Sequence, residues 1–229
     1  MAKRTPSPSN EVELCDRLNF ERTFWTTHPG ALLAGVDEAG RGCLAGPVVA
    51  GAVEIAEADI AQLAANELAA VNDSKQLTEK QREKLWEVLV SHPKVRYGVG
   101  IATVAEIDAI NILNATHLAM RRALEALPQL PQEALVDGLP VKGLPIPHQA
   151  IVKGDMRSLL VACASIIAKV SRDHLCLELD RQYPDYGFAK HKAYCTKAHL
   201  TALRQLGPCP EHRRSFSPVA VVQEEFTFD

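Results

Sequence analysis

Carboxylates follow short apolar runs at three places in this sequence, and a glycine lies close to each of them. The residues concerned are Asp37 with Glu38, Asp137, and Asp155. Short apolar runs bounded by glycine are typical of buried strands. Because an uncompensated charge is costly to bury, we expect these carboxylates where strands emerge from the core.

Carboxylates that converge at strand ends have a plausible chemical use. Hard divalent cations prefer oxygen ligands, and Mg²⁺ accepts one or two carboxylates together with substrate phosphates. Four carboxylates suit two ions roughly 3.5–4 Å apart, the arrangement that assists phosphoryl transfer. Taken singly, Asp37-Glu38 also fits a solvated strand end, Asp137 a turn and Asp155 a helix N-cap. The sequence does not show that the three places meet, but their combination favours a metal site.

The turn Gly40-Arg41-Gly42 follows the first carboxylate pair directly. Neighbouring residues alternate faces along a strand, so an ideal strand would point only Asp37 or Glu38 into a site. The glycines predict a bend that lets both contribute, and they permit a positive φ or a close backbone approach to a ligand. Arg41 adds a planar donor group suited to phosphate.

A basic segment lies near the C-terminus. Residues 187–214 hold six Lys or Arg, one acid and three His, in a chain of formal net charge −3. We interpret it as a phosphate-binding strip in which Tyr194 stacks on a sugar or base and Lys192 contacts the substrate. The alternative is a solvated face with the tyrosine lying over the core. Its histidines lack metal-ligand spacing on one helix face, which predicts a surface or phosphate role for His191, His199 and His212.

Several other residues are weaker candidates. Lys169 and Arg172 lie three apart near the end of a helix, where they complement the helix dipole or contact phosphate. Ser74 and Lys75 precede another helix and suit backbone contacts, although Ser74 equally suits a cap. Cys43 is expected to be a packed small thiol rather than a nucleophile.

The elements that must position these residues begin with a hairpin. A strand over 31–36 and another over 46–55 predict an antiparallel pair, and residues 57–71 predict a surface excursion with a helical turn. Thr78 with Gln81, and Thr103 with Glu106, match capping boxes that open helices on either side of a strand over 94–102. The second helix is expected to bury a stripe consisting of Ile107, Ile110, Leu113, Ala123, Leu124 and Leu127.

Strands are next expected over 134–136 and 150–152, followed by an apolar helix over 158–179 and a helix over 196–206. Small residues in the apolar helix permit close packing. A hairpin followed by strands that alternate with helices predicts an α/β fold with a mixed sheet flanked by helices and a helical C-terminal region.

The remaining composition predicts a cytoplasmic protein. The six cysteines form no C-x-x-C pair, residues 1–10 do not resemble a signal peptide, and no apolar run reaches the roughly 20 residues of a membrane span. We expect residues 1–30 to form a tail and a short, loosely attached helix. Residues 31–229 are expected to form one catalytic domain and the protein to be a monomer without membrane contact.

These motifs together resemble bacterial ribonuclease HII, in order, from about residue 31 to 219. The matching stretches are 35–42 continuing through 44–48, Asn72-Asp73-Ser74-Lys75-Gln76-Leu77, Val136-Asp137-Gly138, Lys153-Gly154-Asp155, 164–170 and Arg213-Arg214-Ser215-Phe216. The resemblance implies a ribonuclease H-like fold and a catalytic, metal-binding set of Asp37, Glu38, Asp137 and Asp155 with Mg²⁺ or Mn²⁺. It also implies hydrolysis of RNA in RNA–DNA hybrids and at single ribonucleotides in DNA, on the 5′ side, leaving 3′-OH and 5′-phosphate ends.

By the same resemblance, Gly40-Arg41-Gly42 reads the 2′-OH that distinguishes RNA from DNA, and Tyr194 packs on the following nucleotide. The family usually has Gly at position 193, where this chain has Ala193. If that Gly needs a positive φ, the local geometry here is expected to differ.

The expected mechanism uses two ions, one that activates water and one that stabilises the leaving oxygen. Whether Asp155 binds metal or positions water is left open. Two other functions fit parts of the pattern: a nuclease or strand-transfer enzyme of the same fold acting on DNA, and a non-catalytic hybrid-binding module. The Gly-Arg-Gly turn argues against the first and the four carboxylates against the second.

Overall fold

Strand β1 (Leu33–Ala39) forms the centre of a five-stranded sheet in the computed structural model, which describes residues 17–71 and 77–227. The order is β3-β2-β1-β4-β5. The other strands are β2 (Val48–Ile55), β3 (Val95–Ala102), β4 (Glu133–Asp137) and β5 (His148–Ile151). β1, β2 and β3 are antiparallel, as predicted for the hairpin, whereas β1, β4 and β5 are parallel.

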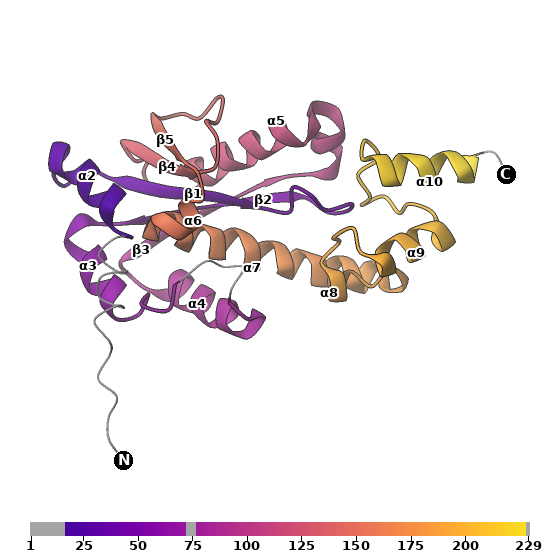
Figure 1. The fold of residues 1–229 in the computed structure, drawn as a ribbon, viewed down its shortest axis with the longest axis horizontal. Coiled ribbons are helices and arrows are strands. Elements are labelled where there is room, and N and C mark those ends of the chain that lie inside the picture. Colours follow the sequence, from indigo (N-terminus) through magenta and orange to yellow (C-terminus); the bar gives the residue numbers. More distant parts are fainter. Residues whose placement is uncertain (1–16, 72–76, 228–229) are drawn as a thin grey trace, which may run out of the picture.

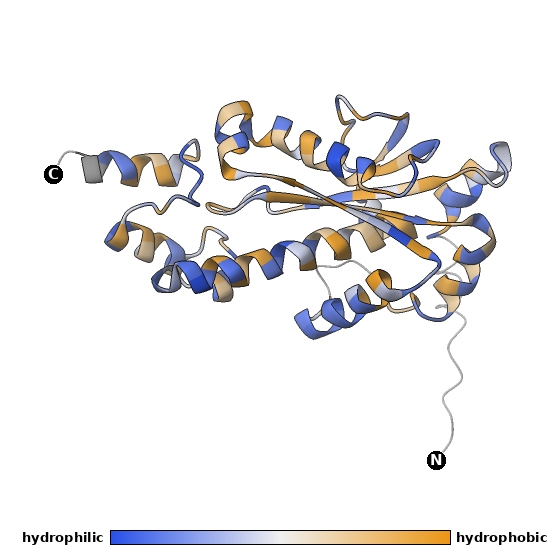
Figure 2. Cartoon of the chain, turned by 180° about the vertical axis from the view of Figure 1, so that it is seen from behind, coloured by the Kyte–Doolittle hydropathy of each residue, from blue (hydrophilic) through white to orange (hydrophobic). Residues whose placement is uncertain are grey.

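Helices cover both faces of this sheet (Figure 1). α7 (Leu159–Gln182) and α4 (Glu79–Ser91) lie on one face, and α5 (Val104–Glu125) lies on the other. The remaining helices are α2 (Asn19–Thr27), α3 (Glu57–Ala65), α6 (Gly154–Arg157), η1 (Pro184–Tyr186), α8 (Phe188–His191), α9 (Lys197–Leu206) and α10 (Ser217–Thr227). Figure 2 shows that the strands are mainly hydrophobic, as expected between two helical layers. The predicted fold class is confirmed.

Both predicted capping boxes are confirmed. The Thr78 hydroxyl accepts from the Gln81 backbone N–H at the start of α4 while the Gln81 side chain accepts from the Thr78 N–H. Thr103 and Glu106 make the same reciprocal pair at the start of α5. These pairs satisfy backbone donors that have no partner within the helix, so the sequence signal determines where both helices begin.

The stripe predicted for α5 is wrong at Ile110 and Leu113. These side chains are 39% and 52% exposed, whereas Ile107 and Leu124 are fully buried. Asn111 interrupts the helix with φ 67° and ψ 163°. The interruption changes the rotation of the helix, so that Leu113, which follows it, no longer shares the face of Ile107. Ile110 lies in the last turn before the interruption.

The segment after β2 is not the surface excursion that was expected. Its apolar side chains Ile60, Leu63, Leu68 and Val71 are all at most 3% exposed and belong to the main core on the α7 side of the sheet. The apolar residues of this segment recur at helical spacing in the sequence, and this pattern indicated a buried helical face.

The expectation of a loosely attached N-terminal helix is also wrong. Phe24 and Trp25 of α2 are buried in the main core. The buried Glu21 carboxylate accepts from the Ser158 hydroxyl at 2.7 Å and from the Leu160 N–H at 3.1 Å. α2 therefore caps the N-terminus of α7, where a carboxylate interacts favourably with unpaired N–H groups.

Gly35 lets α7 approach β1 closely. A Cβ atom at this position would lie 2.1 Å from the Leu160 carbonyl carbon, which no side chain can tolerate. Ala164 and Ala168, the small residues noted in the sequence, are fully buried on the same helix. This close packing brings α7 against the strand that carries Asp37.

Candidate active site

The predicted carboxylates lie at one end of the strands. β1, β4 and β5 are parallel, so their carboxyl-terminal ends lie side by side there. Val36 pairs with Val136, which places Asp37 beside Asp137 in the next row. Asp137 in turn pairs with Ile151 of β5, and the chain then turns directly into α6, which carries Asp155.

Asp37 is almost fully buried at this end of the strands, with 5% of its surface exposed. Its Oδ1 accepts from the Glu38 N–H at 2.7 Å, and the Ser165 hydroxyl of α7 donates a hydrogen bond to its carboxylate. Burial raises the pKa of Asp37 well above its usual value, and the charges of Glu38 and Asp137 raise it further. Burial and the neighbouring carboxylates therefore outweigh the two hydrogen bonds that stabilise ionised Asp37.

Glu38 shares the same electrostatic environment although β1 remains a strand through Ala39. Burial raises the pKa of Glu38 and so does the charge of Asp137, while Arg41 opposes the shift. Arg41 Nη1 donates to Glu38 Oε1 at 3.1 Å. No bend is therefore needed before Glu38, because its place at the end of the strand already brings its charge near Asp137.

Asp137 and Asp155 are linked by the start of α6. Asp137 Oδ1 accepts from the Gly154 N–H at 2.6 Å. Asp137 is the last residue of β4 rather than a turn residue, and α6 is capped by Lys153, so Asp155 lies in the first turn and is not the N-cap. The Asp155 side chain is 3% exposed.

The donor set suits a divalent cation. Asp37, Glu38 and Asp137 supply hard oxygen atoms, and the repulsion that raises the pKa of Asp37 and of Glu38 is what a bound cation would relieve. In the part of the chain that the structure describes, no three Asp, Glu, His or Cys side chains already stand as a complete metal-binding group. One oxygen of each of the three carboxylates accepts a hydrogen bond from the protein, so cation binding requires these side chains to adjust.

The buried side chain of Arg213 holds the backbone of the turn Gly40-Arg41-Gly42 in place through hydrogen bonds. This arginine is fully buried and donates to the backbone carbonyls of Gly40, Arg41, Gly46 and Pro47 over 2.8–3.2 Å. Gly40 has φ +93°, and a Cβ there would lie 2.0 Å from Arg172 Nε. The predicted need for glycine is confirmed at Gly40. The Arg41 side chain is 53% exposed above the turn.

Tyr194 lies beside this turn, because Cys43 and Tyr194 form an antiparallel bridge. The ring is 42% exposed, with Arg172 Cζ 5.8 Å and Lys169 Nζ 6.0 Å from its centroid. Lys169 pairs with Asp173 at 2.5 Å, and Lys192 pairs with Glu79 at 3.3 Å. The structure thus brings Tyr194 and both lysines to the Gly-Arg-Gly turn.

Ala193 adopts the left-handed conformation itself. Its φ is +61°, and Lys192 before it has φ +49°. The sequence predicted a different local geometry if the usual glycine needs a positive φ, but φ is positive here with alanine in place. The backbone keeps a positive φ, at a cost of about 1–2 kcal/mol for a residue with a Cβ.

The basic segment is less exposed than its composition suggested. Arg213 is fully buried, where burial lowers its pKa to about 10, and the Lys192 side chain is only 13% exposed. The remaining exposed cations of this segment are Lys190, Lys197, Arg204 and Arg214. The surface role predicted for the histidines is wrong for His199 and His212, which are fully buried. Ser74 and Lys75 lie outside the described residues.

Two residues of this site, Ser165 and Arg213, were not assigned a role of their own from the sequence. Arg172 was expected to complement the helix dipole or to contact phosphate, but the structure buries it against backbone carbonyls. Ser165 and Arg172 lie on α7, and Arg213 follows α9. Arg172 is 1% exposed and donates to the carbonyls of Lys192 and Ala45 at 2.9 and 3.3 Å. An arginine within a strongly apolar helix was a usable signal, because such a residue is rarely buried without specific partners.

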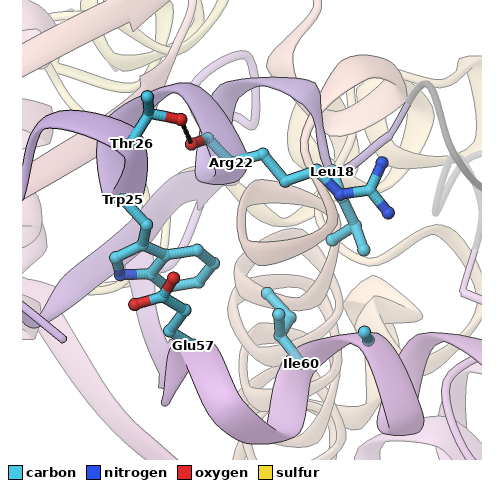
Figure 3. Close-up of a pocket in the computed structure, with 7 residues that line it drawn as sticks. Leu18, Arg22, Trp25, Thr26, Glu57 and Ile60 are labelled. Atoms are coloured by element: carbon cyan, nitrogen blue, oxygen red, sulfur yellow. Dashed lines mark hydrogen bonds between the residues drawn. The ribbon is translucent and has the colours of Figure 1, made fainter. Parts of the chain in front are cut away.

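A pocket elsewhere on the molecule takes no part in this arrangement. It lies between α2 and α3 and is lined by Leu18, Arg22, Trp25, Thr26, Glu57, Ile60 and Ala61 (Figure 3). None of the four predicted carboxylates lines it, so we place the candidate active site at the carboxyl-terminal ends of β1, β4 and β5 instead.

Comparison with known proteins agrees with this geometry. The family model for ribonuclease HII matches residues 34–219. The ribonuclease HII of Desulfitobacterium hafniense (strain Y51) is 52% identical over 203 residues, covering 88% of this chain and 74% of that protein. That of Magnetococcus marinus is 51% identical over 220 residues, covering 95% and 96%.

Solved structures give the same result. The crystal structure of ribonuclease H2 from Pyrococcus horikoshii OT3 has a TM-score of 0.71 and 31% identity, covering 86% of this chain and all of that one. Bst-RNase HIII, solved in complex with Mn²⁺, shares the fold with a TM-score of 0.66 and 17% identity, covering all of this chain and 77% of that one.

Proposed function

The chain belongs to the ribonuclease HII family and is an endoribonuclease acting on RNA in RNA–DNA hybrids; we propose that it also cuts at single ribonucleotides within duplex DNA. Cleavage falls on the 5′ side of the ribonucleotide and leaves 3′-OH and 5′-phosphate ends. The observation that carries this proposal is the gathering of Asp37, Glu38 and Asp137 beside the turn Gly40-Arg41-Gly42.

The proposed cofactor is Mg²⁺ or Mn²⁺, held by Asp37, Glu38 and Asp137. Asp155 completes the set, either as a ligand or by positioning water. A pair of bound divalent cations would supply an activated water and charge stabilisation at the leaving oxygen. The protein's own part is positional: the Ser165 hydroxyl and the Glu38 N–H orient Asp37, and the Gly154 N–H orients Asp137.

Selection for ribose is assigned to Gly40-Arg41-Gly42. Arg213 fixes this backbone through bonds to the Gly40 and Arg41 carbonyls, which supports a role in reading one sugar hydroxyl. Tyr194 offers an exposed ring to the following nucleotide. Recognition through sugar, shape and backbone is independent of base sequence.

Phosphate contacts are assigned to Lys169 and Lys192, which lie beside Tyr194. Each is paired with a carboxylate that a substrate phosphate would replace. For Ser74 and Lys75, which lie outside the described residues, contact with the substrate remains a prediction from the sequence.

We further propose that residues 31–229 form a single catalytic domain, onto which α2 of the N-terminal segment packs, and that the protein is a cytoplasmic monomer. The five cysteines in the described part of the chain are free thiols, as is usual in a reducing compartment. Among the described residues, none of the helices has the length and apolar character needed to cross a membrane.

The test uses a labelled DNA duplex that contains one ribonucleotide, beside an otherwise identical all-DNA duplex. Each is incubated with Mg²⁺, with Mn²⁺ or with a chelator, using the wild type and Asp37→Asn. We expect one nick, 5′ to the ribonucleotide, that requires the metal and is lost in the variant.

Cutting of both duplexes would overturn the assignment of ribose selection to Gly40-Arg41-Gly42. Cleavage that continues undiminished in chelator would overturn the metal site. End-group analysis of the product, by ligation and by phosphatase treatment, decides the polarity of the cut.

A further inference from the structure

A chain of buried hydrogen bonds ends on the backbone carbonyl of Tyr194. It runs from Cys209 through the rings of His212 and His199, and both histidines are fully buried. The Cys209 N–H lies 3.1 Å from His212 Nδ1, the two Nε2 atoms are 3.0 Å apart, and His199 Nδ1 lies 3.0 Å from the Tyr194 oxygen. We call this set of three residues the histidine relay.

The partners at the two ends determine which nitrogen of each ring carries the proton. A backbone N–H can only donate, so His212 Nδ1 accepts and its Nε2 carries the hydrogen. His199 Nε2 then accepts this hydrogen, which leaves Nδ1–H to donate to the Tyr194 carbonyl, a group that can only accept. Burial lowers the pKa of His199 and lowers that of His212 to about 4, so both rings are neutral at pH 7.

The relay ends on a backbone segment that is strained. Lys192 and Ala193 both have positive φ and precede Tyr194 directly. Three successive carbonyls of this segment are held from outside it: Lys192 O by Arg172 Nη1 at 2.9 Å, Ala193 O by the Leu44 N–H at 2.9 Å, and Tyr194 O by His199. A strained conformation persists only where its surroundings hold it in place.

We propose that His199 and His212 are positioning residues that fix the Tyr194 backbone, and through it the ring, in the place where it contacts substrate. This inference rests on the proposed role of Tyr194 in binding the nucleotide after the ribonucleotide. His199 makes the bond to Tyr194, and His212 keeps His199 in the one tautomer that can make it.

The test is a double-mutant cycle on a duplex with one ribonucleotide. His199→Phe keeps a ring of similar size and removes the donor. We expect kcat/KM to fall about tenfold, mainly through a higher KM, since one hydrogen bond to a functional group is lost. In a Tyr194→Ala background, His199→Phe should change kcat/KM by less than about twofold, because the two residues act through one contact.

Two further variants separate positioning from general loss of packing. Phe188→Leu alters the same buried cluster, where its ring lies 5.4 Å from that of His199, without removing a donor. It should lower the melting temperature with kcat/KM unchanged. His199→Asn retains an N–H near the position of Nδ1 and should recover most of the activity lost in His199→Phe.

The outcomes are distinct from one another. If Tyr194→Ala cleaves like the wild type, the role of Tyr194 in the proposed function is wrong and the positioning proposal falls with it. If Tyr194→Ala is impaired but the effect of His199→Phe is fully additive, or equalled by Phe188→Leu, only the positioning proposal is overturned. If His199→Phe does not fold, His212→Asn replaces it in the cycle, because asparagine at position 212 is too short to reach His199. Full additivity with Tyr194→Ala, or an effect equalled by Phe188→Leu, would again overturn the positioning proposal.

Discussion

The buried guanidinium of Arg213 donates from Nη2 to the Gly40 carbonyl at 2.8 Å, although the two residues are 173 positions apart. Three more carbonyls, those of Arg41, Gly46 and Pro47, accept from the same side chain. The turn proposed to read the ribose is therefore held by a residue from the C-terminal third of the chain. A planar group with five donors can serve four acceptors at once, and no other side chain can do so.

Arg213→Lys is accordingly expected to be costly. Lysine leaves most of these carbonyls without their donor, and we expect the free energy of unfolding to fall by about 2–4 kcal/mol. Urea denaturation measures this change. Arg214→Lys is the matched control, since the neighbouring Arg214 is exposed and its replacement should alter stability by less than about 0.5 kcal/mol. Equal effects of the two substitutions would contradict the role given to Arg213.

Asp37→Asn is expected to abolish cleavage and to stabilise the metal-free protein. Burial and the charges of Glu38 and Asp137 disfavour the ionised form of Asp37, and asparagine removes that charge while keeping an acceptor for the Glu38 N–H. We expect the melting temperature in chelator at pH 8 to rise by a few degrees, at roughly 2–4 °C per kcal/mol for a protein of this size.

This gain should depend on pH. The pKa of Asp37 is higher in the folded than in the unfolded state, so the folded protein binds more protons between the two values and wild-type stability falls as pH rises through that interval. The advantage of Asp37→Asn should therefore be small near pH 4 and grow toward neutral pH. The exposed Asp185→Asn is the control and should show no such trend.

Ala193→Gly tests the strained backbone. Relief of the left-handed strain gains about 1–2 kcal/mol, while the added freedom of glycine in the unfolded chain costs about 0.4–1 kcal/mol. The net change is a stabilisation of between about zero and about 1.6 kcal/mol, measured by thermal or urea denaturation. Ala202→Gly inside α9 is the comparison and should destabilise by about 1 kcal/mol. A loss at Ala193 as large as at Ala202 would contradict the strain.

Glu21→Ala tests the attachment of α2. The carboxylate accepts from the Ser158 hydroxyl and the Leu160 N–H at the start of α7, and its removal leaves both donors buried without that partner. We expect a loss of about 2 kcal/mol in the free energy of unfolding. The exposed Glu87→Ala in α4 should have little effect. A neutral result at Glu21 would mean that α2 is not needed to cap α7.

The features that follow from local pattern were predictable from the sequence. Both capping boxes are short-range signals, and the apolar run that ends on Asp37 indicated a buried strand and a carboxylate at its end. Their convergence could be anticipated only as a hypothesis, because the pairing of β1 with β4 joins residues about 100 positions apart.

The features that were missed depend on tertiary partners. Composition counted Arg213 among the surface charges, but four backbone carbonyls hold it in the interior. Periodicity placed Leu113 in the core, but the backbone of Asn111 changes the rotation of α5 before that residue. Neither the four carbonyls nor the Asn111 dihedral angles can be derived from the neighbouring residues alone.

The strand order also has a consequence for how the protein acquires activity during folding. β1 and β2 are consecutive and antiparallel, and only residues 40–47 separate them, whereas the β1–β4 pair joins residues about 100 positions apart. Because long-range pairing is slow, the β1–β2 hairpin can form while the side of β1 that later pairs with β4 is still an unpaired edge. During synthesis the active site is incomplete until α7 and Arg213 have left the ribosome. Until β4 has emerged and paired with β1, the exposed edge of β1 is a place where the nascent chain can aggregate.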